Sequence, residues 1–306
     1  ERDYGFAGSF YAYSIWIGMG VAAIYSFLRK FGPQPVVAIG VTALCTVAVP
    51  GIMASQGWDD HNRADRYTAR DYASNYLNSC QKNAIVFTNG DNDTFPLWYA
   101  QEVEGIRTDI RVVNLSLLNT DWYIDQIKRK AYDSDAVPLS MTQDKYRQGK
   151  REQILIYEQK GIEGYQNIKE MVDFVASDNP NNKFDYGDRA FDYFPSGKFS
   201  IPVDSAKVVA NGTVPKGMEN QIVKSIDFEI DRNYILKAEL MILDLLATNN
   251  WERPIYFAVT VGDDSYIGLQ DYFQLEGLAY RLIPIKSPSG RGDNFGRINT
   301  TLMYDN

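Results

Sequence analysis

Histidine and cysteine are nearly missing from this chain of 306 residues, which has one histidine and two cysteines. A Ser-His-Asp triad, a Cys-His dyad or a histidine-containing zinc site would each have to use His61, so most histidine-based mechanisms are excluded. His61 follows Asp59 and Asp60 after a long apolar stretch, and a polar residue at a membrane boundary is the simpler interpretation. Cys45 lies inside that stretch and Cys80 beyond it, so we expect no disulfide between them, and the compartment is not indicated.

An excess of positive charge is also missing. The chain has 31 lysines and arginines against 39 acidic residues, which gives a formal net charge of -8 at pH 7. The isoelectric point of about 4.9 is far below the range of domains that bind nucleic acid through a basic surface. We therefore expect no nucleic-acid partner.

Charge is absent from two stretches near the start, Tyr4–Leu28 and Phe31–Trp58, which only Arg29 and Lys30 separate. Each exceeds the ~18 to 20 apolar residues that a helix needs to cross a bilayer. Two buried helices of a water-soluble core would show polar positions at helical spacing, and neither stretch does. No basic segment or cleavage site indicates a signal peptide. Residues 1–58 are thus predicted to be a transmembrane hairpin, with membrane lipid as a partner.

Basic residues between spans favour the cytoplasmic side, so Arg29 and Lys30 predict that residues 59–306 lie on the other side. We expect a protein of the inner (cytoplasmic) membrane with a soluble domain on the periplasmic side. Because the chain starts at Glu1 rather than Met, it is expected to be the C-terminal part of a longer membrane protein.

Alternating strands and helices follow the hairpin. After an amphipathic helix over 63–78, an apolar run predicts a strand at 84–88, and its β-branched residues are typical of a buried parallel strand. The pattern then continues with a polar loop at 89–94, a helix from Phe95 to Glu104, a strand at 110–115, a polar loop at 116–121 and a helix at 122–130. This order predicts an α/β domain with a Rossmann-like parallel sheet.

The end of the chain repeats the pattern. We predict a helix at 234–248, a third strand at 254–260 that leads to Gly262-Asp263-Asp264, a helix at 269–276 and a strand at 279–283. Residues 131–230 are interpreted as an inserted α+β cap, with a polar loop at 178–192 and a strand at 198–209 before the Asn211-Gly212 turn. A basic cluster begins at Tyr146, and its part Arg147–Arg151 is expected to be solvated rather than to bind an anion.

Polar side chains follow two of the predicted strands. The carboxyl ends of parallel strands meet at one edge of a sheet, where ligands bind. We therefore expect a ligand-binding rim made by Asn89, Asp91, Asn92, Asp93, Thr94, Asn119 and Asp121. Two explanations stay open for the first five: helix capping, which is the simpler one, or binding of a divalent cation or a sugar hydroxyl.

Aromatic residues flank this rim. Trp98, Tyr99, Trp122 and Tyr123 could stack on a sugar ring, but aromatic residues at helical spacing more often pack against a sheet. Core packing is therefore the expectation for each of them.

Four segments carry a resemblance to a known family. They are Glu1–Tyr4 before the two spans, Phe87–Tyr99, Val113–Tyr123 and Glu276–Leu282, and together they resemble the Bacteroidetes-type DUF2723 membrane proteins. That family is similar to the transmembrane protein O-mannosyltransferases, which have a type C glycosyltransferase fold. The resemblance implies a lipid-phosphate sugar donor and a catalytic carboxylate in an early external loop. That loop would precede Glu1, so no catalytic residue is assigned in this sequence.

Three functions are consistent with these expectations. The first is the end of a membrane glycosyltransferase-like protein whose soluble domain binds a glycan or protein acceptor. The second is a non-catalytic envelope scaffold that docks a partner. The third is a metal-assisted hydrolase built on the rim carboxylates.

Overall fold

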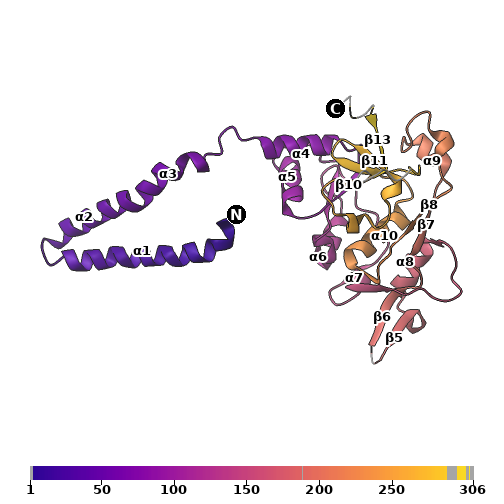
Figure 1. The fold of residues 1–306 in the computed structure, drawn as a ribbon, viewed down its shortest axis with the longest axis horizontal. Coiled ribbons are helices and arrows are strands. Elements are labelled where there is room, and N and C mark those ends of the chain that lie inside the picture. The colour runs from indigo at the N-terminus through magenta and orange to yellow at the C-terminus, as the bar shows by residue number, and fades with distance from the viewer. Residues whose placement is uncertain (1–2, 188, 288–294, 301–302, 304–306) are drawn as a thin grey trace. The chain divides into compact units, whose positions relative to one another are not determined.

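The computed structural model describes residues 3–187, 189–287, 295–300 and 303 (Figure 1). The chain divides into two compact units, Glu1–Arg66 and Tyr67–Asn306. The division expected from the sequence, after Trp58, falls within helix α3 (Ile52–His61).

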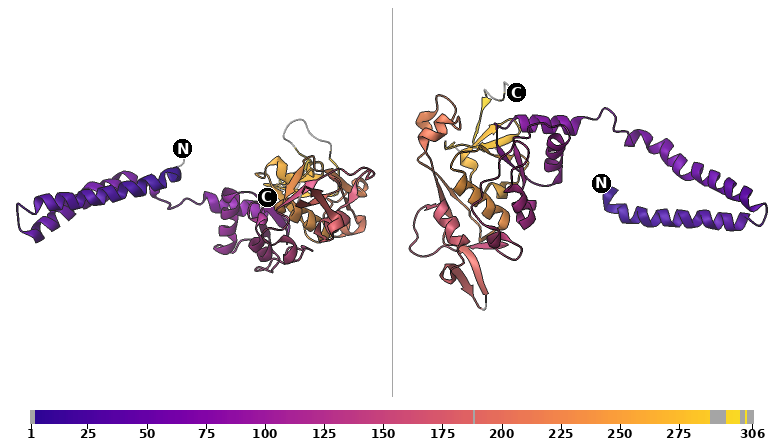
Figure 2. Two further views of the ribbon diagram at one scale, coloured as in Figure 1. Left: turned by 90° about the horizontal axis from the view of Figure 1, so that it is seen from below. Right: turned by 180° about the vertical axis from the view of Figure 1, so that it is seen from behind.

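The first unit is a helical hairpin. Helix α1 (Ala7–Leu28) lies beside a returning helix made of α2 (Gln34–Thr46), a π-helical turn with Pro50 inside it, and α3. Figure 2 shows the two arms meeting at their connection and diverging toward α3 and the start of α1, and α1 contacts α2. Large apolar side chains point outward along both, and Trp16 is 69% exposed. Exposing so many apolar side chains to water is unfavourable. Ala7–Leu28 and Gln34–Asp60 are therefore candidate membrane spans.

The second unit is built on a six-stranded sheet of order β13-β11-β12-β10-β1-β2. Its strands are β1 (Ile85–Thr88), β2 (Arg111–Asn114), β10 (Ile255–Ala258), β11 (Phe273–Glu276), β12 (Ala279–Leu282) and β13 (Arg297–Ile298). Strand β1 pairs in parallel with both β10 and β2, which confirms the three predicted strands and their common direction. Strand β12 is antiparallel to β10 and to β11, so the sheet is mixed rather than parallel.

The helix predicted at 269–276 is wrong. A short 3₁₀ turn at Gln270–Tyr272 leads into β11, which forms a two-residue hairpin with β12. Gly277 has φ +60° in this turn, and such a backbone angle favours glycine. The polar residues of β11 concealed the strand in the sequence. Gln274 and Glu276 are nevertheless fully buried, where they bond to each other and Glu276 also accepts from Tyr256.

Helices pack around the sheet. They are α4 (Thr68–Asn78), α5 (Asp91–Glu102), α6 (Asp121–Ile127) and α10 (Lys237–Asn249). Helix α5 connects β1 to β2, as predicted, and it packs against α4. Helix α10 is buried on nearly all sides, while the rings of Phe87, Phe257 and Phe273 stack in the core at centroid distances of 5.0 and 5.3 Å. Helix α10 begins only after strand β9 (Tyr234–Leu236), which corrects the expected helix start at Tyr234.

The strands that the structure describes in residues 131–230 belong to two smaller sheets. One has the order β5-β6-β3-β9 and the other β4-β7-β8. The strands within this segment are β3 (Gln153–Ile156), β4 (Gln166–Asn167), β5 (Lys183–Tyr186), β6 (Arg189–Phe194), β7 (Lys198–Pro202) and β8 (Ser225–Glu229), and the helices are α7 (Gln143–Tyr146), α8 (Ile168–Ala176) and α9 (Ser205–Ala210).

Three expectations for this segment need correction. The polar stretch 178–192 forms the β5-β6 hairpin instead of a loop, and 198–209 is split into β7 and α9. The cluster Arg147–Arg151 is not solvated throughout, because the buried guanidinium of Arg151 donates to Val175 O at 2.9 Å and to Asp178 at 3.0 Å. Arg151 can be buried because backbone carbonyl groups distant in sequence, such as Val175 O, accept its hydrogen bonds.

Candidate functional site

The loop predicted at 89–94 is for the most part the start of a helix. Asp91, Asn92, Asp93 and Thr94 are the first turn of α5, and the residue before the helix is Gly90, with φ +80° and no side-chain cap. Helix capping by these side chains is therefore wrong. Carboxylates in a first turn still stabilise a helix through its dipole.

Thr94 has a structural role. Its hydroxyl donates to Gly90 O at 2.8 Å, accepts from Asn114 Nδ2 at 2.8 Å and lies 2.8 Å from the Thr88 hydroxyl. These bonds tie the ends of β1 and β2 to the start of α5. Because Thr94 is fully buried, it is not available to a ligand.

Asn119 and Asp121 are also engaged by the protein. Asn119 Oδ1 accepts from the backbone N–H of Ala238 at 3.0 Å, in the first turn of α10. The Asp121 carboxylate accepts from Gln148 N at 3.0 Å and from Trp122 N at 2.7 Å. These two backbone donors hold the pKa of Asp121 below its ordinary value.

The remaining polar side chains at this edge differ in their contacts. The Asn89 side chain accepts from Ser116 Oγ at 3.0 Å. Asp91 and Asn92 are exposed and Asp93 is half-buried, and the carboxylates of Asp91 and Asp93 accept no hydrogen bond from the described part of the chain. Asp91 and Asp93 are therefore the rim carboxylates that stay open to a ligand.

A small cavity of about 140 Å³ lies at this edge of the sheet. Of the seven predicted residues, only Asn89 and Asn119 line it, and Asp91, Asn92, Asp93, Thr94 and Asp121 do not. The sequence analysis missed Ser116, Glu239 and Ser265 in its wall. Ser265 follows the Gly262-Asp263-Asp264 segment to which the third predicted strand leads, so a signal for it was present.

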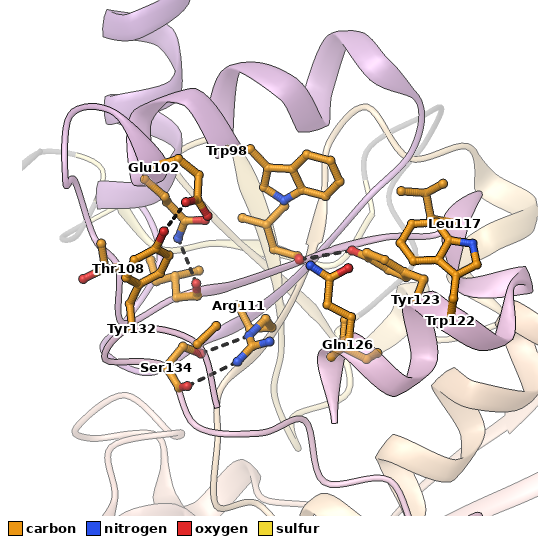
Figure 3. Close-up of a pocket in the computed structure, with 15 residues that line it drawn as sticks. Trp98, Glu102, Thr108, Arg111, Leu117, Trp122, Tyr123, Gln126, Tyr132 and Ser134 are labelled. Carbon is orange, nitrogen blue, oxygen red and sulfur yellow. Dashed lines mark hydrogen bonds between the residues drawn. The ribbon is translucent and has the colours of Figure 1, made fainter. Parts of the chain in front are cut away.

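A larger pocket of about 310 Å³ lies over the edge strand β2, between α5 and α6 (Figure 3). We call it the β2 pocket. Trp98 comes from α5, Trp122 and Tyr123 from α6, and Tyr132 from the loop that follows. Three of the four aromatic residues named in the sequence analysis therefore meet here, while Tyr99 points elsewhere and donates to Glu104 at 2.7 Å.

Core packing, the expectation for all four, holds for Tyr123, and Trp98 also packs against the core. Tyr123 is buried, which raises its pKa to about 12, and it donates to Val112 O. Trp122 is 54% exposed and Tyr99 44% exposed, and Trp98 is half-buried. The helix faces that carry these tryptophans are open because β2 is the last strand of the sheet.

Polar groups join the aromatic walls of the β2 pocket. Glu102 accepts a hydrogen bond from the Tyr132 hydroxyl, and Thr108 Oγ1 donates to Asp133 at 2.7 Å. The amide of Gln126 stands between Trp98 and Trp122 in Figure 3. Sequence reasoning missed Glu102 and Gln126, although each lies four residues after a tryptophan and hence on the same helix face.

In residues 3–187, 189–287, 295–300 and 303, no group of three or more His, Cys, Asp or Glu side chains is placed to hold a metal ion. The divalent cation considered from the sequence stays a prediction.

Comparison with known proteins adds a family. Residues 69–302 match the family described as TMEM260-associated domain 2. The chain belongs to this family. The match starts within α4 and covers the six-stranded sheet, both cavities and the inserted segment, so the candidate site lies wholly within the TMEM260-associated domain. No curated protein and no solved structure matches the chain.

Proposed function

We propose that this chain is the C-terminal part of a membrane glycosyltransferase-like protein, with a soluble domain that binds a glycan or protein acceptor. The observation that carries the proposal is the direct connection of two candidate membrane spans to a TMEM260-associated domain. The resemblance to DUF2723 proteins supports the same class and implies a lipid-phosphate sugar donor.

Within this proposal, the domain positions the acceptor and the membrane part carries out transfer. Asp91 and Asp93 can accept hydrogen bonds from sugar or peptide donors, because the protein leaves their carboxylates open. Asn119, Asp121 and Thr94 hold the rim in shape through the contacts described above. The catalytic carboxylate would belong to the membrane module, outside residues 1–306.

The rim is tested by the double variant Asp91→Asn/Asp93→Asn in the host that makes the native protein. Deleting the gene is expected to remove sugar from envelope glycoproteins, as measured by their intact masses, and the double variant is expected not to restore it. The amount of variant protein in the membrane should be normal, since losing first-turn carboxylates costs only about 1 kcal/mol of stability or less.

Glu170→Gln is the matched control, because Glu170 is an exposed first-turn carboxylate of α8, far from the rim in sequence. It should restore glycosylation fully. Full restoration by the double variant would exclude Asp91 and Asp93 as acceptor ligands. Unchanged glycosylation after gene deletion would contradict the transferase proposal and favour the scaffold.

The proposed orientation, with the soluble domain on the periplasmic side, is tested by labelling introduced cysteines in intact spheroplasts. With Cys45 and Cys80 replaced by alanine, a membrane-impermeant maleimide should modify Lys160→Cys, which is exposed on the soluble domain. It should modify Lys30→Cys only after lysis, because the positive charges of the short loop favour the cytoplasm. The reverse pattern would invert the topology.

A further inference from the structure

We propose that the β2 pocket binds a neutral pyranose ring, with its apolar face against Trp98 and Trp122 and its hydroxyls bonded to Gln126 and Glu102. This inference rests on the proposed function, which it deepens by naming a ligand class and a site that the rim prediction did not include.

The arrangement of the two helices is the first argument. Helix α5 presents Trp98 followed by Glu102, and α6 presents Trp122 followed by Gln126, each pair at i, i+4. Both pairs face the same hollow, so that an aromatic ring and a polar group enter it from either side (Figure 3). Trp98 is held in place by stacking on Phe95, with ring centroids 5.7 Å apart.

Exposure is the second argument. Trp122 is 54% and Tyr132 59% exposed, although both rings line a concave surface. The apolar surface of these rings is exposed to water in the free protein, and a ligand that covers the rings would remove it from water, which is favourable. The floor below them is apolar, with Ile110, Val112, Leu117 and Ile127. A volume of about 310 Å³ is at the lower end of the range for small-ligand pockets.

The polar groups decide which ligand fits. No hydrogen bond engages the Gln126 amide within the described part of the chain, so it offers two donors and an acceptor. Glu102 is bonded by Tyr132 through one carboxylate oxygen, Oε2. An aliphatic or aromatic side chain of a peptide would cover these groups without satisfying them, which is unfavourable. A pyranose has an apolar C–H face and hydroxyls at its edge, and it meets both requirements.

Charge excludes an anionic ligand. The one cation among the lining residues is Arg111, which is buried and donates to Arg129 O at 2.9 Å and to Ser134 O at 3.2 Å. Its guanidinium holds the loop that carries Tyr132, and burial lowers its pKa. With Glu102 in the wall and no open cation, the pocket favours a neutral sugar over a sugar phosphate.

Binding is tested with the full chain in phospholipid nanodiscs, because glycoside detergents would compete. The probes are the methyl glycosides of glucose, galactose and mannose. Their binding is measured by saturation-transfer NMR. We expect transfer to ring C–H protons from at least one glycoside. Trp122→Ala should weaken that binding about tenfold, whereas Tyr165→Ala, which removes an exposed tyrosine outside the pocket, should not. Near-UV circular dichroism confirms that each variant is folded.

Gln126→Leu separates a sugar from an apolar ligand. It keeps the side-chain size but removes the amide, so glycoside binding should fall while binding of N-acetyl-tryptophan amide should not. Glucose 1-phosphate should bind no tighter than methyl glucoside. The proposal is overturned if no glycoside binds, if Gln126→Leu binds glycosides unchanged, or if only the tryptophan amide binds.

These outcomes are independent of the gene-deletion test. Loss of envelope glycosylation on deletion, combined with an absence of glycoside binding, would retain the proposed function and reject the β2 pocket as its sugar site. Glycoside binding without any change in glycosylation would reject the transferase and leave a sugar-binding domain.

Discussion

Replacing Arg253 by methionine is expected to lower the free energy of unfolding of the second unit, Tyr67–Asn306, by about 3–5 kcal/mol. Arg253 is 7% exposed, and its guanidinium is bonded on all three nitrogens. The acceptors are Asn83 O at 2.8 Å, Asp135 O at 2.9 Å, Ala136 O at 3.1 Å, Ser134 Oγ at 3.2 Å and Ala84 O at 3.3 Å. Methionine fills much of the space but donates to none of them.

The cost is large because these acceptors are in two separate segments. One is the approach to β1 and the other is the loop after α6, so Arg253 joins the start of the sheet to the segment that frames the β2 pocket. Each buried carbonyl left without a donor costs about 1–3 kcal/mol. Burial lowers the pKa of Arg253 to about 10, so the side chain is still charged at neutral pH.

Urea unfolding of the full chain in detergent, followed by near-UV circular dichroism, measures this effect. Arg129→Met is the control, since Arg129 is exposed and its side chain makes no hydrogen bond to the described residues. It should change stability by less than about 0.5 kcal/mol. A loss below about 1 kcal/mol for Arg253→Met would show that water replaces the guanidinium at these carbonyls.

The parallel part of the sheet was predictable because its signal is local. Strands β1 and β10 lie in apolar runs of the right length, β2 carries Val112 and Val113 between Arg111 and Asn114, and every residue in the three strands is buried. The β11-β12 hairpin was not predictable in the same way. Gln274 and Glu276 are polar residues typical of a helix surface. Their partners in the core, which include Tyr256 twenty positions before Glu276 and Arg281 on the next strand, are not visible in the local sequence.

The candidate site shows the same limit. The sequence identified Trp98 and Trp122 but assigned them to the core, because their spacing does not show that α5 and α6 flank an edge strand. It placed Asn89 and Asn119 at one edge, where they do line a common cavity. It could not show that Asn119 binds the start of α10, since that contact joins residues 119 positions apart.

Glu276→Leu is expected to destabilise the second unit by about 3–5 kcal/mol, because it leaves the buried guanidinium of Arg281 without its carboxylate partner. Glu276 is fully buried, and its carboxylate accepts from the Tyr256 hydroxyl and from Gln274 Nε2 at 2.6 Å. Arg281, whose side chain is 2% exposed, lies 3.7 Å from Glu276 Oε1. Burial raises the pKa of Tyr256 well above its ordinary value, so its hydroxyl stays a donor.

The double variant Glu276→Leu/Arg281→Met separates the buried charge from the lost packing. When both charges are removed together, no ion remains unpaired, and apolar replacement of a buried pair is often neutral or stabilising. We therefore expect the double variant to recover most of the stability lost by Glu276→Leu, which a double-mutant cycle measures as a coupling of about 2–3 kcal/mol. If the stability losses of Glu276→Leu and Arg281→Met add up to the loss of the double variant, the two side chains do not stabilise each other. In that case the cost of Glu276→Leu would come from the donors that lose their acceptor, which include Tyr256, Gln274 and Asn299.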